Sequence, residues 1–303
     1  MNKFFVTIFT STYNRHYTID RLYHSLLRQT QNNFEWLVID DGSTDDTEKY
    51  FCSLISKPQP FQIRYIKQEN GGKHRAINKG VNIANGALFF IVDSDDYLAE
   101  NAIDKINQWV TSLDNSHKWA GVSGLRGFQN NNPIGKTGLS KKYTDAKHSE
   151  LKKKNLIGDK AQVYFTDILR KYPFPEIEGE NFITEEIVWN AIARENYFIR
   201  WFPQIIYITE YLEDGLTHNF ELLNKKNPKG LCLWAKGQLA TYPHNIIEKM
   251  LAIRCYYLAT QNNLSNKDIS SNLGISTSFL YITIFAAKFA KLFHKTKSIF
   301  FNN

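Results

Sequence analysis

The chain is poor in cysteine, because it contains only Cys52, Cys232 and Cys255, which lie far apart. An odd number of isolated cysteines without metal-site spacing is most simply explained by a reducing compartment. No stretch reaches the ~20 apolar residues of a membrane span. The apolar run at the N-terminus is short and is better explained as a strand than as a secretory signal. We therefore expect a cytoplasmic protein.

The chain also lacks internal repeats and low-complexity linkers. At 303 residues and 43% hydrophobic content, it can bury one large core and carry a smaller appendage. Four apolar segments, each followed by helical or turn sequence, predict a parallel α/β sheet covered on both faces, near 3–9, 34–40, 61–67 and 87–93. A further strand is expected near 119–128. The segment 129–156 is predicted to be a long loop that covers an acceptor site.

The strongest chemical signal is an apolar strand, 88–92, that runs into Asp93, Asp95 and Asp96. Mg²⁺ and Mn²⁺ prefer oxygen ligands and usually bind through one or two carboxylates, with water and substrate phosphates completing the shell. Asp93 and Asp95 alternate at strand spacing, so they can face the same side. Taken alone, the cluster is equally consistent with an acidic loop that only ends a strand.

A second apolar strand ends in Asp40 and Asp41 and continues through a glycine turn, after which Ser43 or Thr44 is expected to cap a helix that begins near Asp45. Open α/β sheets bind ligands at the carboxyl ends of their strands. Asp41 is therefore predicted to accept a hydrogen bond from a nucleobase or ribose. Asp40 is expected only to stabilise the turn.

Two more segments suit a nucleotide. The first strand leads into the polar loop 10–15, whose hydroxyls and single tyrosine, Tyr13, fit a wall against a base; a helix follows near 18–29. Farther along, adjacent glycines precede Lys73 and a helix. Such glycines let the backbone approach a ligand closely, and Lys73 or Arg75 can offset diphosphate charge, although a glycine pair is also ordinary turn sequence.

In order and spacing these segments resemble the inverting glycosyltransferases of family 2, of the bacterial surface-polysaccharide type. The family's patterns have counterparts in Thr-Tyr-Asn at 12–14, Asp-Asp-Gly-Ser at 40–43, Asn-Gly-Gly-Lys at 70–73 and Asp-Ser-Asp-Asp at 93–96. The resemblance covers about 3–115. It implies a GT-A fold, which is a Rossmann-like, mainly parallel sheet with helices on both faces, here with a C-terminal helical extension.

The resemblance also implies roles for individual residues. Ser11, Tyr13 and Asp41 would contact the nucleoside of a nucleotide-sugar donor, Asp93 the ribose or diphosphate, and Asp95, together with Asp93, the Mn²⁺ or Mg²⁺ ion. Lys73 is also assigned to the donor site, because its positive charge can offset that of the diphosphate.

A catalytic base is expected among Glu185 and Glu186, because an acceptor hydroxyl must lose its proton as it attacks. Thr184 is predicted to cap a helix whose buried face carries Trp189, and Glu185 shares that face. In the family an acidic pair opens a helix here, and its second member is the base, which favours Glu186. Because this chain has Glu-Glu instead of Glu-Asp, Glu185 stays open. Alternatively, both glutamates have no catalytic role and only stabilise the positive end of the helix dipole.

We divide the chain into a catalytic domain, 1–219, and a C-terminal helical region, 220–303. The domain would comprise a nucleotide-binding half, 1–115, and an acceptor-binding half, 116–219. In the polar turn near its end, His218 is either a contact of the diphosphate or metal, or a surface residue.

The net charge is +7, and 279–303 holds four lysines but no acid. Apolar residues there, including Ile282 and Phe285, fall on one helical face that lysines flank. This pattern fits either a helix at an anionic membrane surface, at the inner face of the plasma membrane, or a packed C-terminal helix. Nucleic acid is not expected as a partner, because no motif for it is present.

The predicted activity is metal-dependent, inverting transfer of a sugar from a nucleotide-diphosphate sugar to a hydroxyl of a saccharide or lipid-linked saccharide, in cell-surface polysaccharide synthesis. A sugar nucleotidyltransferase is an alternative, but it would need a glycine-rich, basic triphosphate loop after the first strand, which 10–15 lacks. A non-catalytic module that binds a nucleotide sugar or a membrane is the second alternative.

Overall fold

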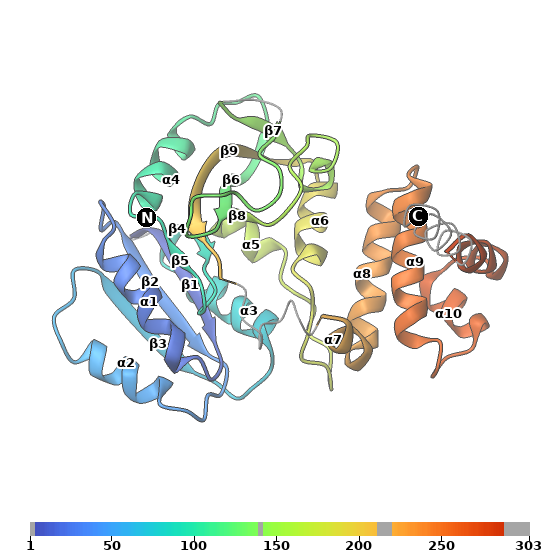
Figure 1. The fold of residues 1–303 in the computed structure, drawn as a ribbon, viewed down its shortest axis with the longest axis horizontal. Coiled ribbons are helices and arrows are strands. Elements are labelled where there is room, and N and C mark those ends of the chain that lie inside the picture. The colour runs from blue at the N-terminus through green and yellow to red at the C-terminus, as the bar shows by residue number, and fades with distance from the viewer. Residues whose placement is uncertain (1–3, 139–141, 211–219, 288–303) are drawn as a thin grey trace, which may run out of the picture.

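The computed structural model describes residues 4–138, 142–210 and 220–287. Its centre is one mixed sheet (Figure 1). The first four strands are parallel neighbours in the order β3-β2-β1-β4, and their bounds are Phe4–Thr12 (β1), Phe34–Asp40 (β2), Gln62–Lys67 (β3) and Gly86–Ile91 (β4). The four strands predicted for this half of the sequence are confirmed to within a few residues.

The sheet continues beyond β4 with strands of mixed direction. β8 (Lys160–Phe165) is antiparallel to β4 and to β6 (Lys118–Gly127), whereas β9 (Tyr197–Ile208) is parallel to β6. The short strands β5 (Tyr97–Leu98) and β7 (Thr144–Ala146) both pair antiparallel with β9. The prediction that 129–156 is one long loop was therefore wrong, because β7 and the 3-10 helix η1 (His148–Glu150) lie within it. A three-residue strand is too short to show periodicity.

Helices cover both faces of the sheet. Alternate residues of β2 separate the two layers, since Trp36 and Val38 belong to one apolar cluster and Leu37 and Ile39 to the other. The first cluster includes side chains of α1 (His16–Leu27), α2 (Thr47–Ile55) and α4 (Ala102–Thr111); the second includes those of α3 (Lys73–Ile83), α5 (Thr166–Lys171) and α6 (Glu186–Arg194). The uninterrupted apolar run of β2 follows from burial on both faces.

Two predicted helix caps were wrong. Asp46 occupies the cap position of α2 without a side-chain bond, and the Ser43 hydroxyl instead accepts a hydrogen bond from the Asn14 backbone N–H at 2.9 Å. The Ser43 side chain is thus engaged by the distant loop that contains Asn14 and does not cap the helix. At α6 the cap position belongs to Glu185, again without a side-chain bond, and Thr184 contributes only its carbonyl to the Ile187 N–H.

The C-terminal region is helical and has an apolar cluster of its own. It comprises α7 (Phe220–Lys226), α8 (Pro228–Thr241), α9 (Ile246–Thr260), α10 (Asn266–Leu273) and a helix over Thr277–Ala287. Leu231 of α8, Ile253 of α9, Ile269 of α10 and Leu280 meet in this cluster. Of these helices, α8 lies next to α6 of the sheet domain (Figure 1). The predicted boundary at residue 219 falls outside the described residues.

Within the described ranges, no single helix combines the length and apolar composition of a membrane span. The helices Asn266–Leu273 and Thr277–Ala287 reach that composition only as a pair, and they are bent by 108°.

Candidate active site

Two adjoining cavities open where β1, β2 and β4 end. The first, of about 390 Å³, is lined by most of the residues predicted to bind the donor and metal: Ser11, Tyr13, Asp41, Lys73, Asp93 and Asp95. The second, of about 410 Å³, is lined by Glu185 and Glu186 together with His148, Gln162 and Trp189. Lys73, Asp93 and Arg126 line both cavities. The structure thus brings these eight predicted residues into one continuous region.

Two loops interlock at the rim of the first cavity. The Thr44 N–H donates to the Asn14 side-chain oxygen at 2.8 Å, which complements the bond from the Asn14 N–H to Ser43. Asn14 adopts a positive φ of 52°, a conformation that asparagine tolerates better than most residues. Next to it the Tyr13 side chain is half exposed and free to contact a ligand in the cavity.

Asp41 fixes the glycine loop, which comprises residues 70–72 before α3. Its buried carboxylate accepts hydrogen bonds from the backbone N–H groups of Gly71 (2.9 Å) and Gly72 (2.8 Å) and from the Gln68 amide (2.8 Å). Its backbone carbonyl accepts a further bond from Asn70 at 2.9 Å. A contact between Asp41 and a nucleoside stays a prediction; in this structure the carboxylate already sets the shape of the loop that precedes α3.

Gly72 allows a distant segment to cross this loop. Its φ is +96°, and a Cβ added there would lie 1.9 Å from the backbone oxygen of Asn181. The crossing segment, residues 177–182, is also held by Arg75, which donates to the carbonyl oxygens of Ile177 (2.7 Å) and Glu180 (2.8 Å). Arg75 is therefore engaged with the backbone, and Lys73 is the cation of this loop that faces the cavities.

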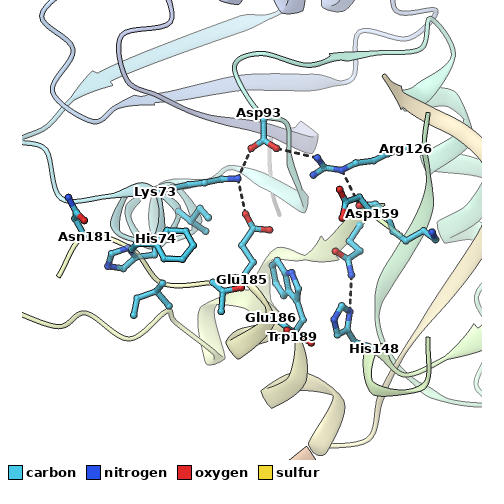
Figure 2. A pocket seen from close by; sticks show the side chains of 16 residues that line it. Lys73, His74, Asp93, Arg126, His148, Asp159, Asn181, Glu185, Glu186 and Trp189 are labelled. Atoms are coloured by element: carbon cyan, nitrogen blue, oxygen red, sulfur yellow. Dashed lines mark hydrogen bonds and ion pairs between the residues drawn. The ribbon is translucent and has the colours of Figure 1, made fainter. Parts of the chain in front are cut away.

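Lys73, which lines both cavities, forms ion pairs with Asp93 and Glu185 (Figure 2). Its ammonium lies 2.6 Å from a carboxylate oxygen of Asp93 and 2.8 Å from one of Glu185. The Arg126 guanidinium lies 3.3 Å from the other Asp93 oxygen, which also accepts from the Tyr207 hydroxyl at 3.2 Å. Burial disfavours the charged form of Asp93, but Lys73 and Arg126 outweigh it and hold the pKa of this carboxyl well below its usual range.

Asp95 and Asp96 have the opposite electrostatic character. Burial and the neighbouring charge of Asp93 raise the pKa of Asp95, and the same two causes raise the pKa of Asp96 to about 7, although Arg126 opposes the shift. Asp96 accepts a hydrogen bond from the Glu210 backbone N–H at 3.2 Å, so it holds the start of the segment that follows β9.

The chemistry of the donor set fits a hard cation at Asp95. Asp93 is already neutralised by two cationic side chains, whereas a bound cation would offset the burial and the repulsion that act on Asp95. Among the described residues, no three or more His, Cys, Asp or Glu side chains are grouped for metal binding. Mg²⁺ and Mn²⁺ do not require such a cage, because substrate phosphates and water complete their shell.

The two glutamates at the start of α6 have different partners. Glu185 forms the ion pair with Lys73, whereas Glu186 accepts a 2.7 Å hydrogen bond from the indole N–H of Trp234 on α8. His148 lines the same cavity, with its Nδ1 3.0 Å from the Gln162 amide nitrogen (Figure 2). Burial lowers the pKa of His148 to about 4, although the charge of Glu186 acts in the opposite direction.

Several residues of the site were missed in the sequence: Arg126 on β6, Tyr207 on β9, His148 on η1 and Trp234 on α8. None of them follows a glycine turn or belongs to an acidic cluster, so no local pattern marks them. They come from the half of the sheet that has mixed strand direction and from the C-terminal helices, and they meet the predicted residues only after folding. His218 lies outside the described residues.

Comparison with known families gives one match to more than half of the chain. The sequence model described as Glycosyl transferase family 2 matches residues 7–172. This match includes most of β1, all of β2, β3 and β4, and the segments that carry Ser11, Asp41, Lys73 and Asp95.

Individual proteins extend this result. Glycosyltransferase GlyG of Streptococcus pneumoniae is 38% identical over 99 residues, which are 32% of each chain, so the match spans about a third of that relative. The Escherichia coli protein UDP-Glc:alpha-D-GlcNAc-diphosphoundecaprenol beta-1,3-glucosyltransferase WfgD is 26% identical over 65% of this chain and 72% of its own. Residues 1–349 of S. aureus TarS, solved with UDP, superpose with a TM-score of 0.61 at 17% identity, over 86% of this chain and 73% of theirs. The last comparison supports the predicted GT-A fold.

Proposed function

Because the chain belongs to glycosyltransferase family 2, we propose that it transfers a sugar from a nucleotide-diphosphate sugar to a hydroxyl of a saccharide or lipid-linked saccharide. The observation that carries this proposal is the pair of adjoining cavities. One is lined by the residues expected to bind a nucleotide, the other by two glutamates, and Lys73 and Asp93 belong to both. A donor and an acceptor can therefore meet at the shared wall.

In the donor cavity, Ser11, Tyr13 and Asp41 would contact the nucleoside, and Lys73 and Asp93 would lie near the diphosphate and ribose. Lys73 can turn from Asp93 to phosphate oxygens while it keeps Glu185 as a partner, since its ammonium carries three donors on a flexible side chain. Asp95, with Asp93 beside it, would hold Mn²⁺ or Mg²⁺. Such an ion stabilises the negative charge of a departing diphosphate when it is bound.

In the acceptor cavity, we assign the base to Glu186. Glu185 is committed to the ion pair with Lys73, whereas Glu186 receives a bond from a neutral indole and keeps an oxygen for a substrate. As the acceptor oxygen forms its bond to the anomeric carbon, the bond from that carbon to the diphosphate breaks, and the hydroxyl proton passes to the Glu186 carboxylate. Attack from the side opposite the diphosphate inverts the anomeric centre.

The name of WfgD contains a diphosphoundecaprenol acceptor, which supports a lipid-linked saccharide as substrate and a place in cell-surface polysaccharide synthesis. We further propose that the catalytic domain is 1–219 and that 220–303 brings it to the inner face of the plasma membrane. The exposed side chains of Tyr281 and Ile282 on the last described helix support this, as does the lysine-rich sequence that follows it.

The donor assignment is tested by a screen of UDP-, GDP- and dTDP-sugars with Mn²⁺, in which hydrolysis and binding are both measured. We expect slow release of free sugar from one nucleotide class, and little release by Glu186→Gln despite parental donor binding. Formation of a nucleotide sugar from a sugar phosphate and a nucleoside triphosphate would favour a nucleotidyltransferase instead. Binding without turnover on any acceptor would favour a non-catalytic module.

Membrane association is tested separately with vesicles that contain phosphatidylglycerol. Ile282→Asp should reduce the fraction of protein that sediments with them, whereas Ile55→Asp, at an exposed isoleucine of α2, should not. Equal sedimentation of Ile282→Asp and the parent would contradict the membrane proposal and leave the donor chemistry untouched.

A further inference from the structure

We propose that Trp234, on helix α8 of the C-terminal region, is a positioning residue that orients Glu186 for proton transfer from the acceptor. This inference rests on the proposed function, because it assumes that Glu186 is the base. It gives the C-terminal helices a part in the chemistry beyond any role at a membrane. The family match ends at residue 172, so neither Trp234 nor Glu186 lies within it.

The contact between the two side chains is direct. The Trp234 indole N–H donates to one carboxylate oxygen of Glu186 at 2.7 Å, and the indole is half-buried. Because an indole N–H donates and cannot accept, it fixes one oxygen of the carboxylate and leaves the other available. A bond of this kind also stabilises the ionised carboxylate, which is the form that accepts a proton.

The backbone around this contact is held at several further points. The Asn227 side-chain oxygen accepts from the backbone N–H groups of Asn181 (2.9 Å) and Phe182 (3.2 Å). The Glu180 carboxylate accepts from the N–H groups of Lys229 (2.8 Å) and Gly230 (2.7 Å), in the first turn of α8.

A glycine lets helix α8 approach this closely. A Cβ added to Gly230 would lie 2.7 Å from a methyl carbon of Ile183. The segment that leads into Glu186 is thus fixed to the helix that carries Trp234. A catalytic side chain needs such support to keep its geometry within about 0.5 Å.

Other titratable groups face Glu186 from neighbouring elements, but they do not compete for Trp234's role. His148 on η1 is neutral above its lowered pKa of about 4. Burial, with a contribution from the charge of Glu186, raises the pKa of Tyr242 at the end of α8 to about 12. Glu185 and Lys73 lie in the same cavity but pair with each other. Within the described residues, none of these groups forms a hydrogen bond with the Glu186 carboxylate, whereas Trp234 donates one.

The test compares Trp234→Phe, which keeps an aromatic ring but removes the donor, with Trp234→His, which can restore a donor. Trp119→Phe is the control, because the Trp119 indole bonds the Asp114 carbonyl and lines neither cavity. We expect Trp234→Phe to lower kcat about tenfold, in line with the loss of a hydrogen bond to a charged group. The acid limb of its pH profile should move to higher pH, because the carboxylate loses stabilisation. Nucleotide Kd should stay parental, and Trp234→His should recover part of kcat.

The double variant Trp234→Phe/Glu186→Gln separates the inference from the proposed function. If Trp234 acts through Glu186, the double variant should be no slower than Glu186→Gln alone. Parental turnover of Glu186→Gln would overturn the base assignment and, with it, this inference. Low turnover of Glu186→Gln together with a parental kcat and pH profile for Trp234→Phe would overturn the inference alone. A parallel loss of nucleotide binding in both Trp234 variants would show a merely structural role and also overturn it.

Discussion

Lys73 and Asp95 lie in one site, but their surroundings act on their charges in opposite ways: the charged form of Lys73 is stabilised and that of Asp95 is destabilised. Lys73 is held by two carboxylates, and although burial opposes the charged ammonium, Asp93 and Glu185 raise its pKa above the usual range. Asp95 is a half-buried acid beside another acid, and both the partial burial and the neighbouring charge raise its pKa. A diphosphate with a divalent cation would satisfy both residues, since the phosphate attracts Lys73 and the cation relieves Asp95.

Asp95→Asn is therefore expected to abolish transfer and to remove the Mn²⁺-dependent part of nucleotide affinity, because the amide keeps the shape but loses the charge that attracts the ion. Nucleotide titrations with and without Mn²⁺ measure this effect. Asp114→Asn, at a largely exposed turn acid, is the control and should behave as the parent. Full activity of the parent in excess chelator would refute the metal assignment.

Two histidines with lowered pKa values, the buried His74 and the half-buried His148, predict a pH dependence of stability. Burial lowers the pKa of His74 to about 4, with Arg75 adding to the effect, and burial lowers that of His148 to about 4. The unfolded chain, with a histidine pKa near 6.5, then binds more protons than the folded one between pH 6.5 and 4. Stability is fully present above pH 6.5 and is lost as the pH falls through this window, at about 1.4 kcal/mol per pH unit for each histidine at most.

Urea unfolding at pH 7.5 and pH 5 measures this loss. His74→Leu should reduce it, because neither ring nitrogen of His74 has a hydrogen-bond partner in the described structure. His117→Gln, at an exposed histidine, is the control and should leave the difference unchanged. An equal free-energy difference in His74→Leu and the parent would contradict the assignment.

At the scale of elements, the glycine loop before α3 and the segment 177–182 form one unit. Asp41 holds the loop from β2, Arg75 holds the crossing segment from α3, and Gly72 lets the two backbones approach. The unit connects the cavity around Asp41 to the start of α6, so we expect a change in the loop to alter the positions of Glu185 and Glu186.

Gly72→Ala is expected to weaken nucleotide binding and transfer together. Its positive φ alone costs about 1–3 kcal/mol for a residue with a side chain, and the added carbon would also displace the Asn181 carbonyl. Isothermal titration with the nucleotide and thermal unfolding measure the two effects. Gly237→Ala is the control, since a Cβ there meets its nearest atom only at 4.0 Å. Parental affinity in Gly72→Ala would mean that the crossing segment is dispensable for the donor site.

For the whole molecule, the C-terminal helices complete the sheet domain. Besides the bonds from α8 to residues 180–186, Arg194 of α6 donates to the Thr241 hydroxyl at 2.9 Å, and Lys152 pairs with Glu248 of α9 at 2.6 Å. The cavity that contains Glu186 thus depends on two parts of the chain that are far apart in sequence.

A chain that ends at residue 219 is accordingly expected to keep measurable nucleotide affinity, because the donor cavity is built almost entirely from the sheet domain. It should lose most transfer activity, since Glu180 and Glu186 lose their partners on α8 and Asn181 loses its bond to Asn227. Nucleotide titration of the truncated chain shows whether it has folded, and turnover on the acceptor completes the test. Turnover at the parental rate would show that the C-terminal helices are dispensable for chemistry.

The four parallel strands β1 to β4 and the loops that follow them could be predicted from the sequence. The strands β1, β2 and β4 are largely apolar, and each is followed by a short polar motif, so the positions of Asp41 and Asp95 follow from local pattern and from the parallel arrangement of these strands, while Lys73 follows the glycine pair before α3. The family membership followed from the same motifs. These features were readable because each depends on residues that are neighbours in the chain.

Tertiary structure alone decided the rest. The predicted helix caps at Ser43 and Thr184 were wrong. Ser43 accepts a hydrogen bond from the distant Asn14 instead, and the Thr184 side chain forms no cap bond. Arg126 and Tyr207 enter the site through long-range strand pairing, whose register no short motif encodes, and His148 follows the short strand β7, which also pairs with β9. The division of labour between Glu185 and Glu186 depends on Lys73 and Trp234, which are more than a hundred and nearly fifty residues away in sequence. Identical side chains in adjacent positions acquire different roles only from the partners that folding brings to them.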